Sequence, residues 1–135
     1  MEKGLRDEIL LRLEKARKKM IAAKKLFEEG LYEDAISRAY YAVYHAAKSA
    51  LLLIGDDPKS HDGVLHLFGL RFVKSGLVDK NLGITLRKLK EMRETADYNV
   101  LAFFSEEEVK EAIKDAEKFL DEIEKFVREK IENLN

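Results

Sequence analysis

The chain of 135 residues contains no cysteine, no tryptophan and only one proline. Without cysteine it can form neither a disulfide framework nor a thiolate metal site, which suits a reducing compartment. No apolar run approaches the roughly 18 residues of a membrane span, and the first residues lack the apolar core of a signal peptide. These absences favour a soluble, cytoplasmic protein with no membrane segment.

The chain also lacks an excess of charge of either sign, because its 25 basic residues nearly balance its 26 acidic ones and the net charge is −1. The bulk charge therefore does not steer the protein toward nucleic acid, and RNA or nucleotide binding needs a local patch. A basic run, 15–25, lies between acidic residues; we interpret it as a solvated face first and as an RNA-contact surface second. At this length we expect a single helical domain over residues 1–135.

The chain does contain apolar residues at helical spacing, and no stretch has the alternating pattern that predicts a strand. We expect five helices, over 5–29, 32–54, 61–75, from about 79 to 97–99, and from 105 onward. Glycines at 30, 55 and 76 suit the ends of the first three. Ser105 and Glu108 form a capping box before the last helix, and Phe104 with Val109 can form a hydrophobic staple.

Four long amphipathic helices with short links predict an all-α, antiparallel up-and-down bundle, with the shorter third helix packed across one end or side. The link 99–104 is short and apolar, so we expect it to pack on the body of the bundle or on a partner.

The second helix has two faces. Its apolar stripe comprises Ile36, Ala39, Tyr40, Val43, Ala47, Ala50, Leu51 and Ile54, while Arg38, Tyr41 and His45 share the other side. In a functional interpretation, Arg38 binds a phosphate and His45 transfers protons near neutral pH. In the alternative, the tyrosines are packing residues and His45 hydrogen-bonds a neighbouring helix. This aromatic side should line a groove or a subunit interface, and a homodimer is the simplest assembly that covers it.

Arg93 and Asp97 lie one turn apart near the end of the fourth helix, so an ordinary intrahelical ion pair is the default. In a functional version, Arg93 enters the same groove as Arg38. Asp97 would then orient it, and Tyr98 would hydrogen-bond a substrate.

Ser60 is the expected cap of the third helix, which places His61 at its positive end. The helix dipole then favours a neutral His61 that can accept a proton. We expect His66 to be a partly buried packing residue. The five-residue spacing of His61 and His66 does not support a metal site, and no cofactor is indicated.

An ordered series of short motifs resembles the HEPN domain (higher eukaryotes and prokaryotes nucleotide-binding), in particular its small stand-alone prokaryotic members. The series is Ser37-Arg38-Ala39-Tyr40-Tyr41-Ala42, Ala50-Leu51-Leu52, Ser60-His61-x-Gly63-Val64, Phe72-Val73-Lys74-x-Gly76 and Arg93-x-x-Ala96-Asp97-Tyr98. The resemblance extends over about residues 16–126. It implies a helical bundle that forms a homodimer, with a cleft between the protomers.

The same resemblance implies an activity and a partner. Many relatives are metal-independent endoribonucleases, and many pair with a small nucleotidyltransferase in toxin–antitoxin modules. Their signature is an arginine followed, after four to six residues, by a histidine. Arg93 matches the arginine, whereas Tyr98, Asn99 and Val100 stand where the histidine would be. His45 or His61 would therefore have to replace the missing imidazole.

We accordingly expect a homodimer whose cleft binds RNA or a nucleotide. The candidate catalytic residues are Arg93, His45 and Tyr98, and the candidate binding residues are Arg38, Tyr41, Asp97 and His61. The alternative is a non-catalytic docking subunit of a complex with a nucleotidyltransferase. A third interpretation, that a tyrosine such as Tyr98 accepts nucleotidyl groups from that partner, follows from the family alone.

Overall fold

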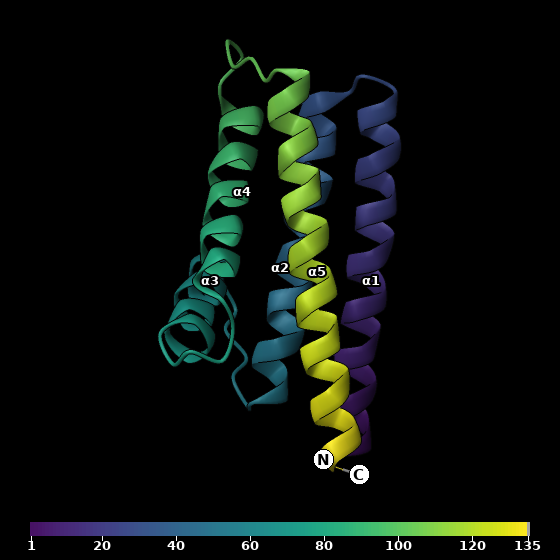
Figure 1. Ribbon diagram of the computed structural model, residues 1–135, viewed down its shortest axis with the longest axis vertical. Coiled ribbons are helices and arrows are strands. Elements are labelled where there is room, and N and C mark those ends of the chain that lie inside the picture. The colour runs from purple at the N-terminus through teal and green to yellow at the C-terminus, as the bar shows by residue number, and fades with distance from the viewer. Residues whose placement is uncertain (135) are drawn as a thin grey trace.

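The computed structural model describes residues 1–134 and is all-helical (Figure 1). Its elements are α1 (Lys3–Glu28), α2 (Tyr32–Leu53), α3 (His61–Phe68), the π-helical turn η1 (Gly69–Val73), α4 (Lys80–Tyr98) and α5 (Glu106–Leu134). The expected all-α class is confirmed, and most boundaries agree within two residues.

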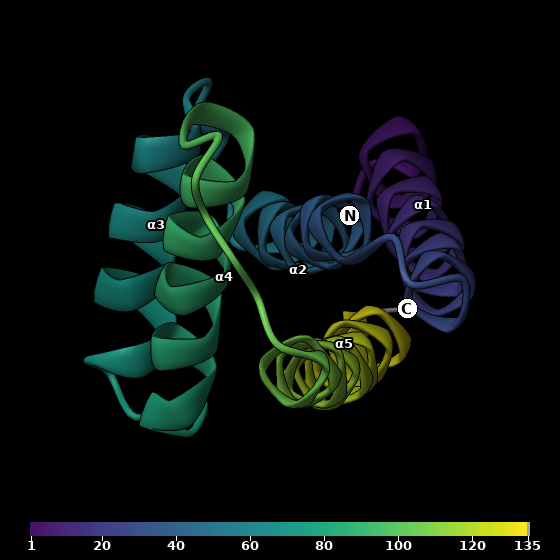
Figure 2. The ribbon, with the colours of Figure 1, turned by 90° about the horizontal axis from the view of Figure 1, so that it is seen from above.

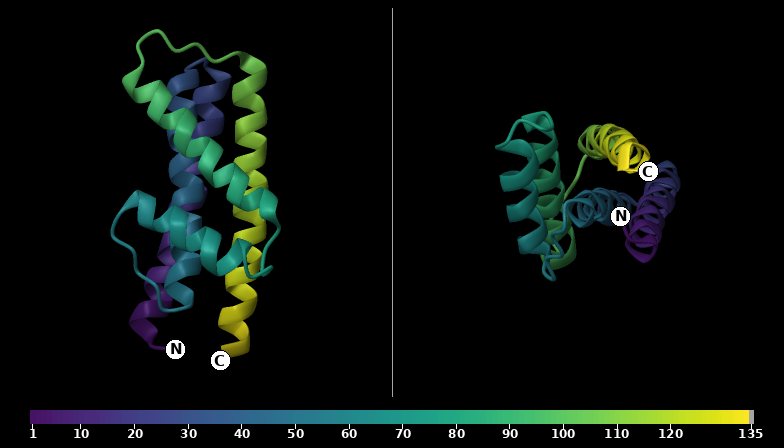
Figure 3. Two further views of the ribbon diagram at one scale, coloured as in Figure 1. Left: turned by 90° about the vertical axis from the view of Figure 1, so that its left-hand side faces the viewer. Right: turned by 90° about the horizontal axis from the view of Figure 1, so that it is seen from below.

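The long helices α1, α2, α4 and α5 run alternately up and down, as expected (Figure 1). Seen along the bundle, α2 occupies the centre, with α1 on one side, α4 on the other and α5 alongside (Figure 2). The short α3 lies outside α4, on the side of the molecule away from α1, and α4 crosses the bundle diagonally (Figure 3). Helix α2 therefore contacts α1, α3, α4 and α5, which explains why the central part of its sequence contains few charged residues.

The burial of α2 follows its apolar stripe, with one exception. Ile36, Ala39, Tyr40 and Val43 are fully buried, whereas Ile54 is 43 % exposed because the helix ends at Leu53. Helix α2 also buries two polar residues that the stripe does not include. Ser49 donates to the Ala46 carbonyl at 2.6 Å, and Lys48 is paired with Asp57 at 2.7 Å, so neither is left without a partner.

The third helix differs from the sequence-based prediction. It was expected to continue to Ser75, but α-helical bonding stops at Phe68 and η1 follows, with the Lys74 amide donating to the Gly69 carbonyl at 2.8 Å. The spacing of apolar residues does not separate this bonding from an α-helix. His66 was expected to be partly buried, and this was wrong, because its side chain lies on the exposed face of α3.

The start of α5 agrees with the expected capping box. The Glu108 amide donates to Ser105 Oγ at 3.1 Å, and the Ser105 amide donates to Glu108 Oε1 at 3.4 Å. Phe104 packs partly against the core and Val109 is buried, as a hydrophobic staple requires. The glycines at 30, 55 and 76 all have positive φ, which a helix end of this type favours.

Replacing Ser105 by alanine is expected to lower the free energy of unfolding by about 1 kcal/mol, because two amides at the start of α5 lose their bonding arrangement. Urea unfolding followed by circular dichroism measures the change. Thr95→Ala is the control, because Thr95 is exposed on α4 and no side-chain bond of its hydroxyl is found in residues 1–134. A Ser105→Ala midpoint equal to that of Thr95→Ala would contradict the capping role.

The link between α4 and α5 does not pack on the bundle. Val100, Leu101 and Phe103 are 97 %, 88 % and 84 % exposed, and of its large residues only Phe104 turns inward. The link forms a loop at the end of the molecule where α1 also turns into α2 (Figure 1). Of the two expectations for this segment, packing on the body is wrong for these three side chains, and contact with a partner stays a prediction.

None of the helices in residues 1–134 combines the length and the apolar character needed to cross a membrane.

Candidate functional site

An aromatic–arginine cluster lies where α2, the start of α3 and α4 meet. We define it as Tyr40, Tyr41, Tyr44, His61 and Arg93. Helix α2 supplies three tyrosines within five positions, so that they occupy adjacent positions on the side facing α3 and α4. Pro58 and Ser60 lead into α3, and Ser60 caps it by accepting from the Gly63 amide at 2.9 Å, which fixes His61 at the first helical position.

Tyr40 and His61 form the inner part of the cluster. Tyr40 is fully buried, and its hydroxyl lies 2.6 Å from His61 Nδ1, with the two rings stacked at 5.7 Å between centroids. Burial raises the pKa of Tyr40, and burial together with the charges of Arg93 and Lys90 lowers the pKa of His61. At neutral pH the tyrosine is therefore protonated and donates to Nδ1, which leaves the imidazole proton on Nε2.

Arg93 covers the two tyrosines from α4. Its guanidinium carbon lies 5.0 Å from the centroid of Tyr40 and 5.8 Å from that of Tyr41, which is cation–π geometry. Asp97 accepts a hydrogen bond from Arg93 Nη1 at 3.2 Å. Arg93 Nε is buried and has no hydrogen-bond partner within the described residues. The arginine is thus held in place while one of its donors is unused.

His45 adjoins the cluster on the side of α1. Tyr44 stacks on His61 at 4.3 Å and meets the edge of His45 at 5.4 Å, and His45 Nδ1 lies 3.4 Å from Arg12 Nη1. Burial, and then the positive charges of Arg12, Lys15 and Lys19, lower the pKa of His45 to about 4. His45 is therefore neutral at pH 7, and this differs from the near-neutral titration that the sequence suggested.

The structure brings together most of the candidate residues. Tyr41, His61, Arg93 and Asp97 lie in or directly against the cluster, and His45 borders it through Tyr44. The expected Arg93–Asp97 ion pair is present, and the same pair holds Arg93 over the tyrosines.

Two candidates stand apart from the cluster. Arg38 is exposed on α2, and no hydrogen bond or ion pair of the described residues joins it to Arg93. Tyr98 is the last residue of α4 and is 80 % exposed, beside the apolar loop. The functional roles proposed for both remain predictions.

Three contributing residues were not foreseen. Tyr40 was assigned only to the apolar stripe, and Tyr44 only to packing, although both contact His61. Arg12 was not considered at all. A weak signal for it exists, because Arg12 lies 18 residues before Gly30 and His45 lies 15 residues after it, and an antiparallel helix pair brings such positions within about a turn of each other.

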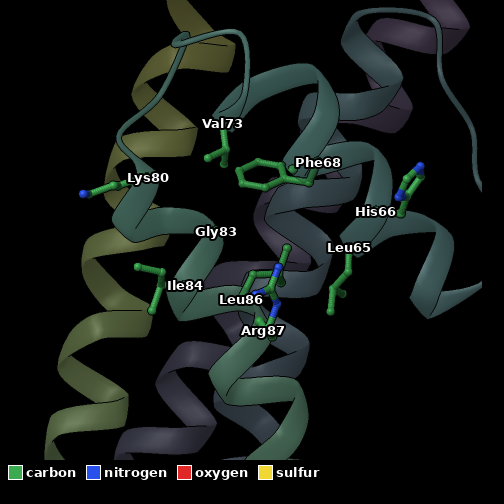
Figure 4. Close-up of a pocket in the computed structure, with 10 residues that line it drawn as sticks. Leu65, His66, Phe68, Val73, Lys80, Gly83, Ile84, Leu86 and Arg87 are labelled. Carbon is green, nitrogen blue, oxygen red and sulfur yellow. The ribbon is translucent and has the colours of Figure 1, made fainter.

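A separate hollow of about 280 Å³ lies between α3–η1 and α4 (Figure 4). Its floor is apolar, including Phe68 and Leu86, while Lys80 and His66 point away from it (Figure 4). Because no polar side chains converge there, we do not assign it a ligand. Within residues 1–134, no group of three or more acidic, histidine or cysteine side chains is placed to hold a metal ion.

Comparison with known proteins matches residues 9–126 to the model of the HEPN domain. A protein of Methanocaldococcus jannaschii named a "putative toxin" is 42 % identical over 129 residues, which is 96 % of either chain. A Thermotoga maritima protein named a "UPF0332 protein" is 40 % identical over 115 residues, 85 % of this chain and 87 % of its own. A second "putative toxin" of M. jannaschii is 31 % identical over 127 residues, 94 % of this chain and 86 % of its own. The ordered motifs of the second, third and fourth helices thus carry a family assignment, and the chain belongs to the HEPN domain family.

Proposed function

We propose that this protein binds RNA at the aromatic–arginine cluster, as a toxin-like member of its family acting in the cytoplasm. The observation that carries the proposal is Arg93, whose guanidinium is fixed over Tyr40 and Tyr41 and has more donors than the one that Asp97 takes. A guanidinium held in this way is preorganised to bind a phosphate, and neighbouring aromatic rings suit bases. The names of two relatives as putative toxins support the toxin-like setting.

The same geometry supplies some, but not all, of the groups that metal-independent cleavage needs. Cleavage of RNA without metal needs a base for the 2′-hydroxyl, an acid for the leaving oxygen and a cation for the developing charge. Arg93 supplies the cation, but His61 Nδ1 accepts from Tyr40 and His45 Nδ1 faces an Arg12 donor, so neither neutral ring has a free acceptor for the 2′-hydroxyl proton. Neither imidazole is charged at pH 7, because burial and neighbouring cations lower both pKa values. One protomer thus holds a phosphate site but neither a free imidazole base nor an imidazolium acid, and binding is the function we propose first.

Arg93→Ala is expected to weaken binding of a single-stranded RNA by about tenfold or more, since charged hydrogen bonds to phosphate contribute about 1.5–3 kcal/mol. Fluorescence anisotropy at low salt measures it. Arg87→Ala is the matched control, because Arg87 lies on the same helix, is exposed and carries the same charge. Arg93→Lys keeps the charge and loses the planar fork, so it should fall between the two. Equal affinity of Arg93→Ala and Arg87→Ala would reject the site.

Incubation of the same proteins with RNA in EDTA tests for cleavage. Product formed by the wild type and lost in Arg93→Ala and His45→Ala would extend the function to a metal-independent endoribonuclease. Product that is unchanged by either substitution would indicate a contaminating nuclease.

A second candidate function is docking to a protein partner, for which the family suggests a nucleotidyltransferase. The exposed loop favours it, because Val100, Leu101 and Phe103 present a contiguous apolar surface that the chain itself leaves uncovered. Carboxylates lie near this surface: Glu33 and Asp34 line the same hollow as Phe103, and three glutamates form the first turn of α5 just after the loop, so the loop is a poor surface for RNA. We infer that the protein acts as a homodimer and binds its partner through this loop.

Replacing Val100, Leu101 and Phe103 together by serine tests the docking role. The variant should still fold and bind RNA, because these side chains are exposed and distant in sequence from the α2 tyrosines. It should lose the complex with a co-expressed nucleotidyltransferase from a neighbouring gene, as followed by size-exclusion chromatography with light scattering. Unchanged complex formation would exclude the loop, and a wild-type monomer at micromolar concentration would exclude the homodimer.

A further inference from the structure

The basic residues of α1 fall into two groups that the sequence does not separate. Toward α5 the cations are paired: Arg17 with Asp121 and Glu124 at 2.8 and 2.7 Å, and Lys24 with Glu117. Lys18, on the outer face, pairs with Glu14. These charges are neutralised within the fold, so they offer little to an external anion.

The other group faces α2. Arg12, Lys15 and Lys19 recur at spacings of three and four residues, so they line one side of α1 over about 10 Å. All three lower the pKa of His45, which places their charges near that ring. Arg12 has a single carboxylate partner, Glu8, at 3.5 Å, and no ion pair of Lys15 or Lys19 is found in residues 1–134. We call these three residues the α1 cation strip.

The strip and Arg93 lie at the two ends of one connected group of aromatic rings. Arg12 is in contact with His45, His45 meets the edge of Tyr44, Tyr44 stacks on His61, and His61 meets the edge of Tyr41, which Arg93 covers. The connected path therefore runs from cations on α1, across partly buried rings on α2 and α3, to a cation on α4. Tyr41, Tyr44, His45 and His61 all retain some exposure along this path.

From this arrangement we propose that the protein holds a single-stranded RNA along a track that crosses α2, with its backbone on the α1 cation strip and a base against the ring of Tyr44. The proposal rests on RNA binding at the cluster and adds the strandedness of the RNA and a second contact region. Aromatic side chains flanked by cations bind single strands, because unpaired bases expose a face for stacking. A duplex hides those faces within its own stack and offers only its backbone.

The first test is a comparison of strip and control variants. Lys15→Gln/Lys19→Gln should weaken binding of a 12-nucleotide oligouridine several-fold and reduce the slope of log affinity against log salt by about 1.4, since each phosphate contact on a single strand contributes about 0.7. Lys18→Gln/Lys25→Gln changes the same charge on the same helix outside the strip. It should leave the slope within about 0.3 of the wild type. Lys15, Lys18 and Lys25 are exposed and Lys19 is partly exposed, and thermal unfolding verifies that all variants are folded.

The second test concerns strandedness. The wild type should bind oligouridine at least about tenfold more tightly than an RNA duplex of equal length, and Tyr44→Leu should remove about fivefold or more of that preference. Equal weakening by the strip and control variants, or a preference for duplex, would overturn the track. If Arg93→Ala weakens binding and the strip variant does not, the cluster remains an RNA site and only the track is wrong. If the wild type binds no RNA at 50 mM salt, both proposals are rejected.

Discussion

Replacing Tyr40 by phenylalanine is expected to lower the free energy of unfolding by about 2 kcal/mol. It should also allow His61 to populate both neutral tautomers. The substitution removes one hydroxyl and keeps the ring, so Arg93 retains its cation–π contact. His61 Nδ1 loses the donor that lies 2.6 Å away, and an acceptor left unpaired in a partly buried site is costly. The imidazole proton is then no longer directed to Nε2 alone.

Side-chain ¹⁵N and ¹³C NMR measures the tautomer directly, and the spectrum is simple because the chain has three histidines. The wild type should show His61 as the Nε2–H form at pH 7.5, and Tyr40→Phe should show a mixture. Tyr41→Phe is the matched control, because no hydrogen bond of its hydroxyl is found in residues 1–134, and its stability should change by less than about 0.5 kcal/mol. An Nε2–H form that persists unchanged in Tyr40→Phe would contradict the role of Tyr40 as the positioning residue.

This pair of residues also shows what sequence could predict. The helices, their caps and the buried stripe of α2 depend on spacing within one segment, so periodicity predicts them well. Tyr40 is in the stripe and is fully buried, as expected. Its second role depends on His61, which reaches it only through the turn around Pro58 and the Ser60 cap. A contact of this kind between two segments is part of the tertiary structure, and the spacing of residues on one helix does not predict it.

The same limit explains the other differences. The sequence grouped Arg38, Tyr41 and His45 on one face, and helix geometry makes that reasonable. What each residue meets depends on which neighbour packs beside α2: Arg93 of α4 lies over Tyr41, Arg12 of α1 contacts His45, and Arg38 is exposed. The π-helical turn was likewise not predicted, and packing of the link 99–104 on the bundle was predicted wrongly for its three exposed side chains, because both depend on how consecutive helices meet.

Lowering the pH from 7 to 5 is expected to reduce the free energy of unfolding by about 1 kcal/mol, chiefly through His45. Its pKa is about 4 in the folded protein, against an ordinary value near 6.5 in the unfolded chain. Between these values the unfolded state binds more protons, so stability rises with pH across this window. The contribution is complete above pH 6.5 and is lost as the pH falls toward 4. Without screening, this shift would be worth about 2 kcal/mol between pH 7 and pH 5, and the partial exposure of the ring to water reduces it.

Urea unfolding at pH 7.5, 6 and 5 measures this dependence, and His45→Gln should remove most of it. His61 adds to the slope in the same direction, because its pKa is also lowered. The lowered pKa values of Asp57 and Asp62 act below about pH 4, outside this window. His66→Gln is the control, since His66 is exposed and should leave the slope unchanged. Arg12→Gln should flatten it, because one of the cations that oppose protonation of His45 is gone. A His45→Gln protein with the same loss of stability as the wild type would show that the ring is not held neutral by its buried, cationic surroundings.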